Sequence, residues 1–202
     1  MQNLPSHRQF LTSLIENLST GQPQPAAINR EPPHLIPPDR RQLLLTLHVL
    51  FPSLLLPALD LLDRRLVTHI RNPDAPGSAP LQLYVVRSLG TTLGRRRRDA
   101  GYTARSYVVR LGPWNCSCAS FALDAFPPGG EISSGNSERA EQGCAWFGGM
   151  SRDGLEGVRV DVPCCKHLLA CLLAERWNDL LGGYVESKEV SREEMAGIVA
   201  GG

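Results

Sequence analysis

Apolar residues at helical spacing mark the start of the chain. Phe10, Leu11, Leu14, Ile15 and Leu18 fall on one face of a helix that begins near residue 6 and ends by residue 21. The stretch that follows, residues 21–38, is rich in proline and predicts an extended linker. We therefore expect residues 1–20 to form an N-terminal helix that is an appendage of the core.

Two leucine-rich segments follow the linker. Asp39 comes directly after two prolines and is a good N-cap for a helix that reaches about Phe51. A second helix is expected to begin near Ser53, to hold Pro57 in its first turn and to end by Arg65. The whole stretch is long enough to cross a bilayer, but two prolines and a carboxylate interrupt it. We expect two short, mostly buried helices and no contact with a membrane.

Alternating and β-branched residues predict three antiparallel strands after the helical pair, at residues 66–71, 81–89 and 104–111. Residues 127–157 are rich in Gly, Ser and Glu without periodicity, which predicts an inserted loop. A leucine-rich helix then begins near residue 165 and ends at a pair of glycines. The predicted domain therefore covers residues 39–185.

The remaining residues, 186–202, are expected to form a C-terminal tail with a weak helix near Glu193. A chain of 202 residues with 42% hydrophobic and 20% charged residues has the size and composition of one soluble domain with appendages. Its formal net charge of +1 gives no general attraction to nucleic acid. Any contact with nucleic acid must therefore come from a local patch.

All six cysteines lie between Cys116 and Cys171, and four of them form two tight pairs. A secreted disulfide framework would spread them more widely. The first ten residues also lack the basic and apolar regions of a signal peptide. We expect an intracellular, reducing compartment, where clustered Cys and His bind metal more often than they form disulfides.

Two pairs of potential ligands stand at metal-binding spacing. Cys116 and Cys118 follow the third strand, and Cys165 and His167 stand at the start of the leucine-rich helix. Two thiolates from one turn and a thiolate and an imidazole from another suit the tetrahedral coordination of one structural zinc ion. Cys164 competes with Cys165, because Cys-x-x-His is also a plausible ligand spacing.

Other interpretations of these cysteines and of His167 are less well supported by the sequence. Cys144 and Cys171 are expected to be ordinary loop and core residues, and the whole set can be read as buried thiols. A catalytic Cys–His pair lacks a visible base and orienting group, and four ligands leave no open position for a hydrolytic metal. The sequence therefore predicts an α+β protein in which a helical pair, a three-stranded antiparallel sheet and a zinc-pinned C-terminal helix form one domain.

A run of four basic residues, Arg95, Arg96, Arg97 and Arg98, is the one marked charge cluster. It is interpreted as a solvated loop, a phosphate contact that would bind nucleic acid, or a nuclear-import signal. The chain has no P-loop sequence, so we expect it to bind no nucleotide. No paired carboxylates or nucleophile elbow point to an enzyme.

The zinc motif resembles a known family. Cys-x-Cys followed at a distance by Cys-x-His, which enters a leucine-rich helix as CKHLLACLLA, resembles the SWIM-type zinc finger. The preceding segments, LHVLFPSLLLPALDLLDRRLVTHI and LYVVRSLG, are similar to the SWIM-domain subunit of the Shu complex. The resemblance covers about residues 40 to 182.

The resemblance implies a function. In that family the SWIM subunit is a non-enzymatic partner of a RecA-like recombinase paralog in the nucleus. The complex assists assembly of the recombinase filament on single-stranded DNA in homologous recombination. The matching ligands are Cys116, Cys118, Cys165 and His167, which favours Cys165 over Cys164. This chain has a longer segment between the ligand pairs, and its arginine run is an addition whose role is not inherited.

Two other functions fit the same motif. The first is a SWIM adaptor that recognises a protein substrate for a ubiquitin ligase. The second is a DNA-binding finger of transposon origin, against which the near-neutral net charge counts.

Overall fold

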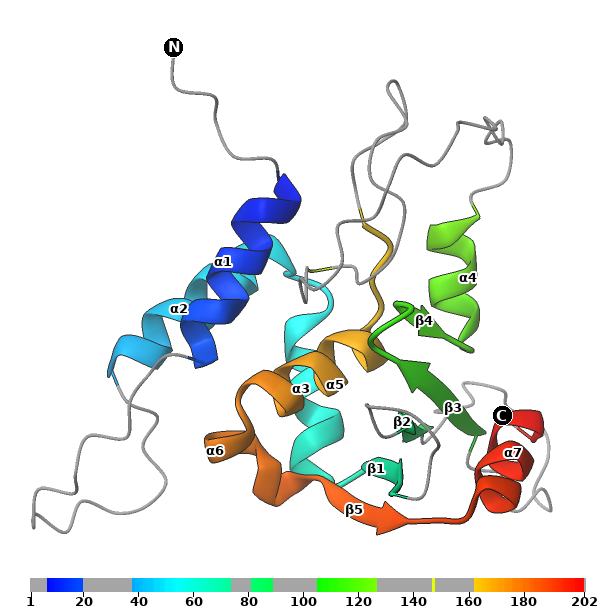
Figure 1. The fold of residues 1–202 in the computed structure, drawn as a ribbon. Helices are drawn as coiled ribbons and strands as arrows, with labels where there is room; N and C mark the ends of the chain where they lie inside the picture. The colour runs from blue at the N-terminus through cyan, green and yellow to red at the C-terminus, as the bar shows by residue number, and fades with distance from the viewer. Residues whose placement is uncertain are drawn as a thin grey trace, which may run out of the picture.

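The computed structural model describes residues 7–19, 38–73, 81–88, 105–126, 147 and 162–201. Most of the predicted linker, most of the predicted inserted loop and the arginine run at residues 95–98 lie outside the described residues. The described part is a mixed α+β structure (Figure 1). Its elements in chain order are α1 (His7–Ser19), α2 (Pro38–Leu50), α3 (Leu55–Asp63), β1 (Val67–Asn72), β2 (Leu81–Ser88), β3 (Arg105–Arg110), β4 (Asn115–Cys116), α4 (Ala119–Ala125), α5 (Lys166–Arg176), α6 (Asn178–Leu181), the 3₁₀ helix η1 (Gly182–Tyr184), β5 (Glu186–Glu189) and α7 (Arg192–Ala200).

Among the described residues, the sheet has five strands in the order β4-β3-β2-β1-β5. The three predicted strands are its centre and pair antiparallel, with Val67 opposite Val86 and Val86 opposite Tyr107. The prediction of a three-stranded sheet is therefore wrong in the number of strands. The two additional strands escaped it because β4 has only two residues and all four residues of β5 are exposed, so neither shows alternation.

Helices cover both faces of this sheet. On one face, Val67, Val86 and Val109 lie in the main hydrophobic cluster together with the leucines of α5 and the buried residues of α3. On the other face, Ile70 and Leu83 belong to a second cluster. That cluster also contains Val108 and the α7 residue Met195. The alternation of the strands thus supplies two cores rather than one.

The N-terminal helix joins the main core. Leu11, Leu14 and Ile15 of α1 are buried in the main cluster that contains α5. The expectation that this helix is an appendage is therefore wrong. Its apolar face was visible in the sequence, but the surface that this face covers could not be identified from the pattern alone.

The helical pair folds close to its predicted bounds as α2 and α3. Arg40 anchors the start of α2, because its guanidinium pairs with Asp179 of α6 at 2.6 Å and lies over the ring of Trp177. The hydrogen bond from Arg40 lowers the pKa of the Asp179 carboxyl below its usual value. None of the helices among the described residues is long and apolar enough to cross a membrane.

Residues of the predicted tail complete the sheet. β5 pairs in parallel with β1, and the buried side chain of Asn72 donates a hydrogen bond to the carbonyl of Val190 at 3.1 Å. Ser191 and Glu194 then form a capping box that starts α7, which is the helix expected near Glu193. The segment after residue 185 thus supplies one edge of the sheet and the cover of its second face.

The second core predicts a stability effect for the C-terminal segment. Met195→Ala should lower the free energy of unfolding by about 2 kcal/mol, because it empties a buried site against Ile70, Leu83 and Val108. The exposed control Lys188→Ala should stay within about 0.5 kcal/mol of the wild type. Urea unfolding measures both. Equal stability of the two variants would mean that α7 is not part of the cooperative fold.

Candidate metal centre

The first ligand pair lies where the sheet edge turns into a helix. Cys116 ends β4, and Cys118 is the N-cap of α4, where its sulfur accepts a hydrogen bond from the backbone N–H of Phe121 at 3.3 Å. Between them, Ser117 exchanges two hydrogen bonds of 3.0 Å with the backbone of Val108. These two hydrogen bonds attach the turn between Cys116 and Cys118 to β3. They therefore restrain the positions of the two sulfurs.

The second ligand pair starts α5. Cys165 is the N-cap residue, with an extended backbone, and His167 lies in the first turn of the helix. Leu168 and Leu169, which come directly after, are fully buried and fix the rotation of the helix. Both ligand pairs therefore stand at the N-terminus of a helix, where the helix dipole favours a negatively charged thiolate.

The structure brings the four predicted metal ligands together. The ligand atoms of Cys116, Cys118, Cys165 and His167 all lie within 4.8 Å of one another, and all four residues are buried. The Nδ1 atom of His167 is 3.8 Å from the sulfur of Cys116 and 3.9 Å from that of Cys165. A tetrahedral zinc ion would hold a sulfur and a nitrogen about 3.6 Å apart, so the arrangement is close to the size of such a site.

The three cysteines of the cluster shift the pKa values of one another. The pKa of Cys118 is lowered, because its sulfur accepts hydrogen bonds from the thiols of Cys116 and Cys165. The pKa of Cys116 is raised through its hydrogen bonds to Cys118 and Cys165 and through burial. For Cys165, the hydrogen bond with Cys116 lowers the pKa. The hydrogen bond with Cys118 and burial outweigh this effect, so the pKa of Cys165 is raised to about 11. The three thiols thus share hydrogen bonds, and a bound dication would replace their protons.

The two nitrogens of the His167 imidazole have different surroundings. Its Nδ1 faces the sulfurs, and its buried Nε2 has no hydrogen-bond partner among the described residues. A metal on Nδ1 would leave the proton on Nε2. The ring of Tyr107 lies 4.7 Å from the imidazole and packs against it. The four residues could therefore hold one metal ion, with His167 binding through Nδ1.

The other cysteines lie apart from this cluster as far as the structure describes them. The Cys164 thiol donates to the carbonyl of Cys165 at 3.7 Å, and the Cys164 backbone N–H donates to Asp124. Cys171 is fully buried within α5, and Cys144 lies outside the described residues. The geometry thus selects Cys165 rather than Cys164 as the partner of His167 in the cluster.

Two neighbours of the centre were missed in the sequence. Tyr107 was counted only as a strand residue, although its alternation with Val109, which pairs with Cys116, would have placed it on the ligand side of β3. Ser117 was read as the spacer between two ligands, and no pattern in the sequence shows its hydrogen bonds to Val108. Side-chain contacts of this kind depend on the register between paired strands, which cannot be derived from the sequence pattern alone.

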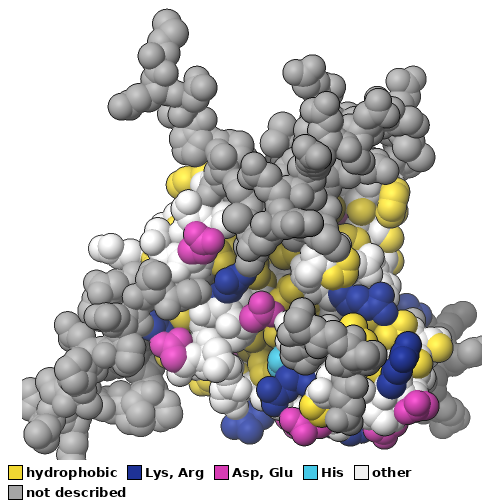
Figure 2. Space-filling model, viewed as in Figure 1, with side chains coloured by type: hydrophobic (Ala, Val, Ile, Leu, Met, Phe, Trp, Pro, Cys, Tyr) yellow, Lys and Arg dark blue, Asp and Glu magenta, His cyan; other side chains and the backbone are white. Residues whose placement is uncertain are grey.

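Next to the centre, α4 exposes an apolar face. Phe121 is buried beneath this helix, whereas Leu123 and Phe126 are 65% and 75% exposed. Figure 2 shows hydrophobic side chains at the surface over α4. Because α4 begins at Cys118, the position of this face is set by the first ligand pair.

The remaining predicted site residues cannot be placed. Arg95–Arg98 belong to the connection between β2 and β3 and lie outside the described residues.

No family model and no curated protein matches the chain.

Metal content separates the two candidate cysteines. We expect the purified chain to carry about one metal ion, which Cys164→Ser retains and Cys165→Ser loses, because only the Cys165 sulfur faces the other ligands. Loss of the metal should lower the free energy of unfolding by an amount on the order of 4 kcal/mol. Elemental analysis and chemical denaturation measure the two effects. Metal retained by Cys165→Ser and lost by Cys164→Ser would contradict this assignment.

Proposed function

We propose that this chain is a zinc-binding, non-enzymatic subunit of a Shu-type complex, which pairs with a RecA-family recombinase paralog and promotes recombinase filament assembly in the nucleus. The observation that carries the proposal is the buried cluster of three cysteines and one histidine. Three thiolates and an imidazole suit zinc better than the hard cations, which prefer oxygen ligands. The order of the ligands, with the second pair opening a leucine-rich helix, agrees with a SWIM-type finger.

The zinc would have a structural role. All four ligands come from the chain and all are buried, which gives a closed tetrahedral site with no position for a substrate or reactive water. Its effect is to tie β4 and α4 to the start of α5. Because α5 lies in the main core together with α1 and α3, this connection supports the whole helical side of the molecule.

Exposed apolar side chains on the helical pair support a protein partner. The leucines of α5 are buried within the chain itself, so that helix offers no docking face. In contrast, Leu45 and Val49 of α2 and Leu56 of α3 are 65%, 78% and 61% exposed. Leu45 and Val49 are four residues apart and share one face of α2. We propose that the face of α2 that carries Leu45 and Val49 contacts the recombinase paralog.

An affinity purification tests the pairing. The tagged wild-type chain should recover a RecA-family paralog from nuclear extract, and Val49→Glu should lose it, because a charge in the contact face is costly to desolvate. Val49 is exposed, so this variant should keep the metal content and melting temperature of the wild type. Cys164→Ser is the control that should keep the partner.

The alternatives give distinct results in the same experiment. Ubiquitin-ligase components without any recombination protein would support a SWIM adaptor instead. A chain that recovers neither class of protein but binds DNA by itself would support a transposon-derived finger. Either result would contradict the Shu-type assignment while leaving the zinc site in place.

The arginine run gives a separate prediction. Replacing Arg95–Arg98 with alanine should weaken binding to single-stranded DNA and reduce the dependence of log K on log salt by up to about 3, since each phosphate contact contributes about 0.7. Replacement by four lysines keeps the charge and should preserve most of the salt dependence. Fluorescence anisotropy over a salt series measures both, and identical curves for the alanine variant and the wild type would rule out a phosphate contact.

A further inference from the structure

Trp114 occupies an unusual backbone position beside the metal centre. It stands in the turn between β3 and β4, two residues before Cys116, with a φ of 51°. A bulky residue rarely adopts this left-handed conformation, and such positions persist where the surrounding contacts demand them. The side chain is only 3% exposed.

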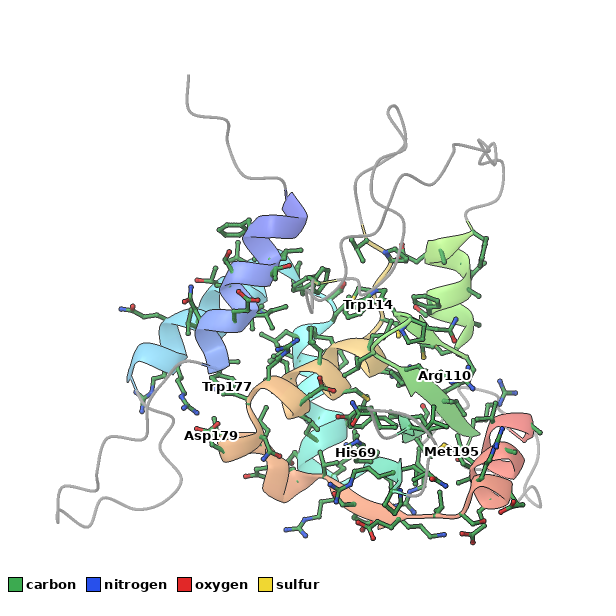
Figure 3. The ribbon with its side chains drawn as sticks, in the orientation of Figure 1. His69, Arg110, Trp114, Trp177, Asp179 and Met195 are labelled. Carbon is green, nitrogen blue, oxygen red and sulfur yellow. The ribbon has the colours of Figure 1, made fainter. Side chains whose placement is uncertain are left out.

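The indole connects the two ligand-bearing segments. Its Nε1–H donates a hydrogen bond of 2.7 Å to the carbonyl oxygen of Pro163. Pro163 stands two residues before Cys165, just as Trp114 stands two residues before Cys116. Figure 3 shows Trp114 directed from the β3–β4 turn toward the segment that leads into α5. One side chain thus holds the approaches to both ligand pairs.

Phe147 holds the indole from the other side. Its ring lies 4.9 Å from that of Trp114 and 5.8 Å from that of Phe51, and it is 3% exposed. The backbone N–H of Phe147 donates to the hydroxyl of Thr12 in α1 at 2.9 Å. A residue from the segment between the two ligand pairs therefore packs on the tryptophan and restrains the orientation of its ring.

We propose that Trp114 is the positioning residue of the metal centre, held in place by Phe147. This inference rests on the zinc binding proposed above. The hydrogen bond to Pro163 keeps Cys165 and His167 opposite Cys116 and Cys118 before any metal arrives. The metal then has less chain entropy to overcome when it joins two segments that are distant in sequence. Preorganised ligands retain their metal longer.

A second buried tryptophan provides a matched control. Trp177 at the end of α5 is 1% exposed, but its Nε1–H has no hydrogen-bond partner among the described residues. Trp114→Phe and Trp177→Phe therefore make the same chemical change in the same core, and only the first removes a hydrogen bond. Phe147→Ala and Phe126→Ala form the second pair, one buried against Trp114 and one exposed at the end of α4.

The test is the rate at which the zinc-loaded chain releases its metal to a chromogenic chelator. Trp114→Phe should release zinc about fivefold faster than the wild type, the effect of one lost hydrogen bond. Phe147→Ala should act in the same direction, while Trp177→Phe and Phe126→Ala should stay within about twofold. The Co²⁺-loaded Trp114→Phe variant should keep a tetrahedral absorption spectrum with weaker Co²⁺ affinity, because the ligands themselves are unchanged.

The outcomes separate this inference from the zinc proposal. Zinc release from both Trp114→Phe and Phe147→Ala at the wild-type rate would overturn the positioning role and leave the zinc site intact. An equal acceleration in Trp177→Phe would do the same, since it would indicate general loosening of the core. If Trp114→Phe does not fold, the zinc-release rates of Phe147→Ala and Phe126→Ala test the positioning role. Faster release from Phe147→Ala alone supports it, and equal rates overturn it. A wild-type chain that holds no zinc would overturn both proposals together.

Discussion

The convergence of three sulfurs and one imidazole in a buried site is the constraint on which the rest of the structure depends. Cys116 and Cys118 come from the edge of the sheet, and Cys165 and His167 come from the start of α5. Four buried groups of this kind are costly unless protons or a cation compensate them. One metal ion can neutralise the thiolates and join the two segments at once. Such an ion would also fix the start of α5, whose buried residues belong to the main hydrophobic core.

The two cores of the sheet explain why the fold needs its C-terminal segment. α3 and α5 cover one face with the main cluster, and α7 covers the other with a smaller one. The parallel pairing of β5 with β1 brings α7 to that second face, and Asn72 secures the junction through Val190. The Cys/His cluster stands at the β4 edge and the C-terminal segment at the β5 edge, so different groups of residues stand at the opposite edges of the sheet.

Regular patterns made much of this structure predictable. The bounds of α2, α3, β1, β2 and β3 and the start of α5 follow from apolar periodicity, and the spacing of Cys116, Cys118, Cys165 and His167 indicated which side chains would meet. The helix that was expected to reach the glycine pair instead ends at Arg176, and α6 and η1 follow it. The parts that were missed have no repeat to reveal them. β4 is too short, β5 is polar and exposed throughout, and Phe147 is a single anchor in a stretch with no periodicity. Trp114 matters through a strained turn and one hydrogen bond, which only the folded chain displays.

We propose that a single zinc ion is bound by three sulfurs and one nitrogen of this chain. X-ray absorption spectroscopy at the zinc edge of the purified protein tests it most directly, because it reports the number, type and distance of the ligands. We expect three sulfurs at about 2.3 Å and one nitrogen at about 2.0 Å from the zinc ion. A shell of four sulfurs, which would bring Cys164 into the site in place of His167, or a shell of oxygen ligands would contradict it.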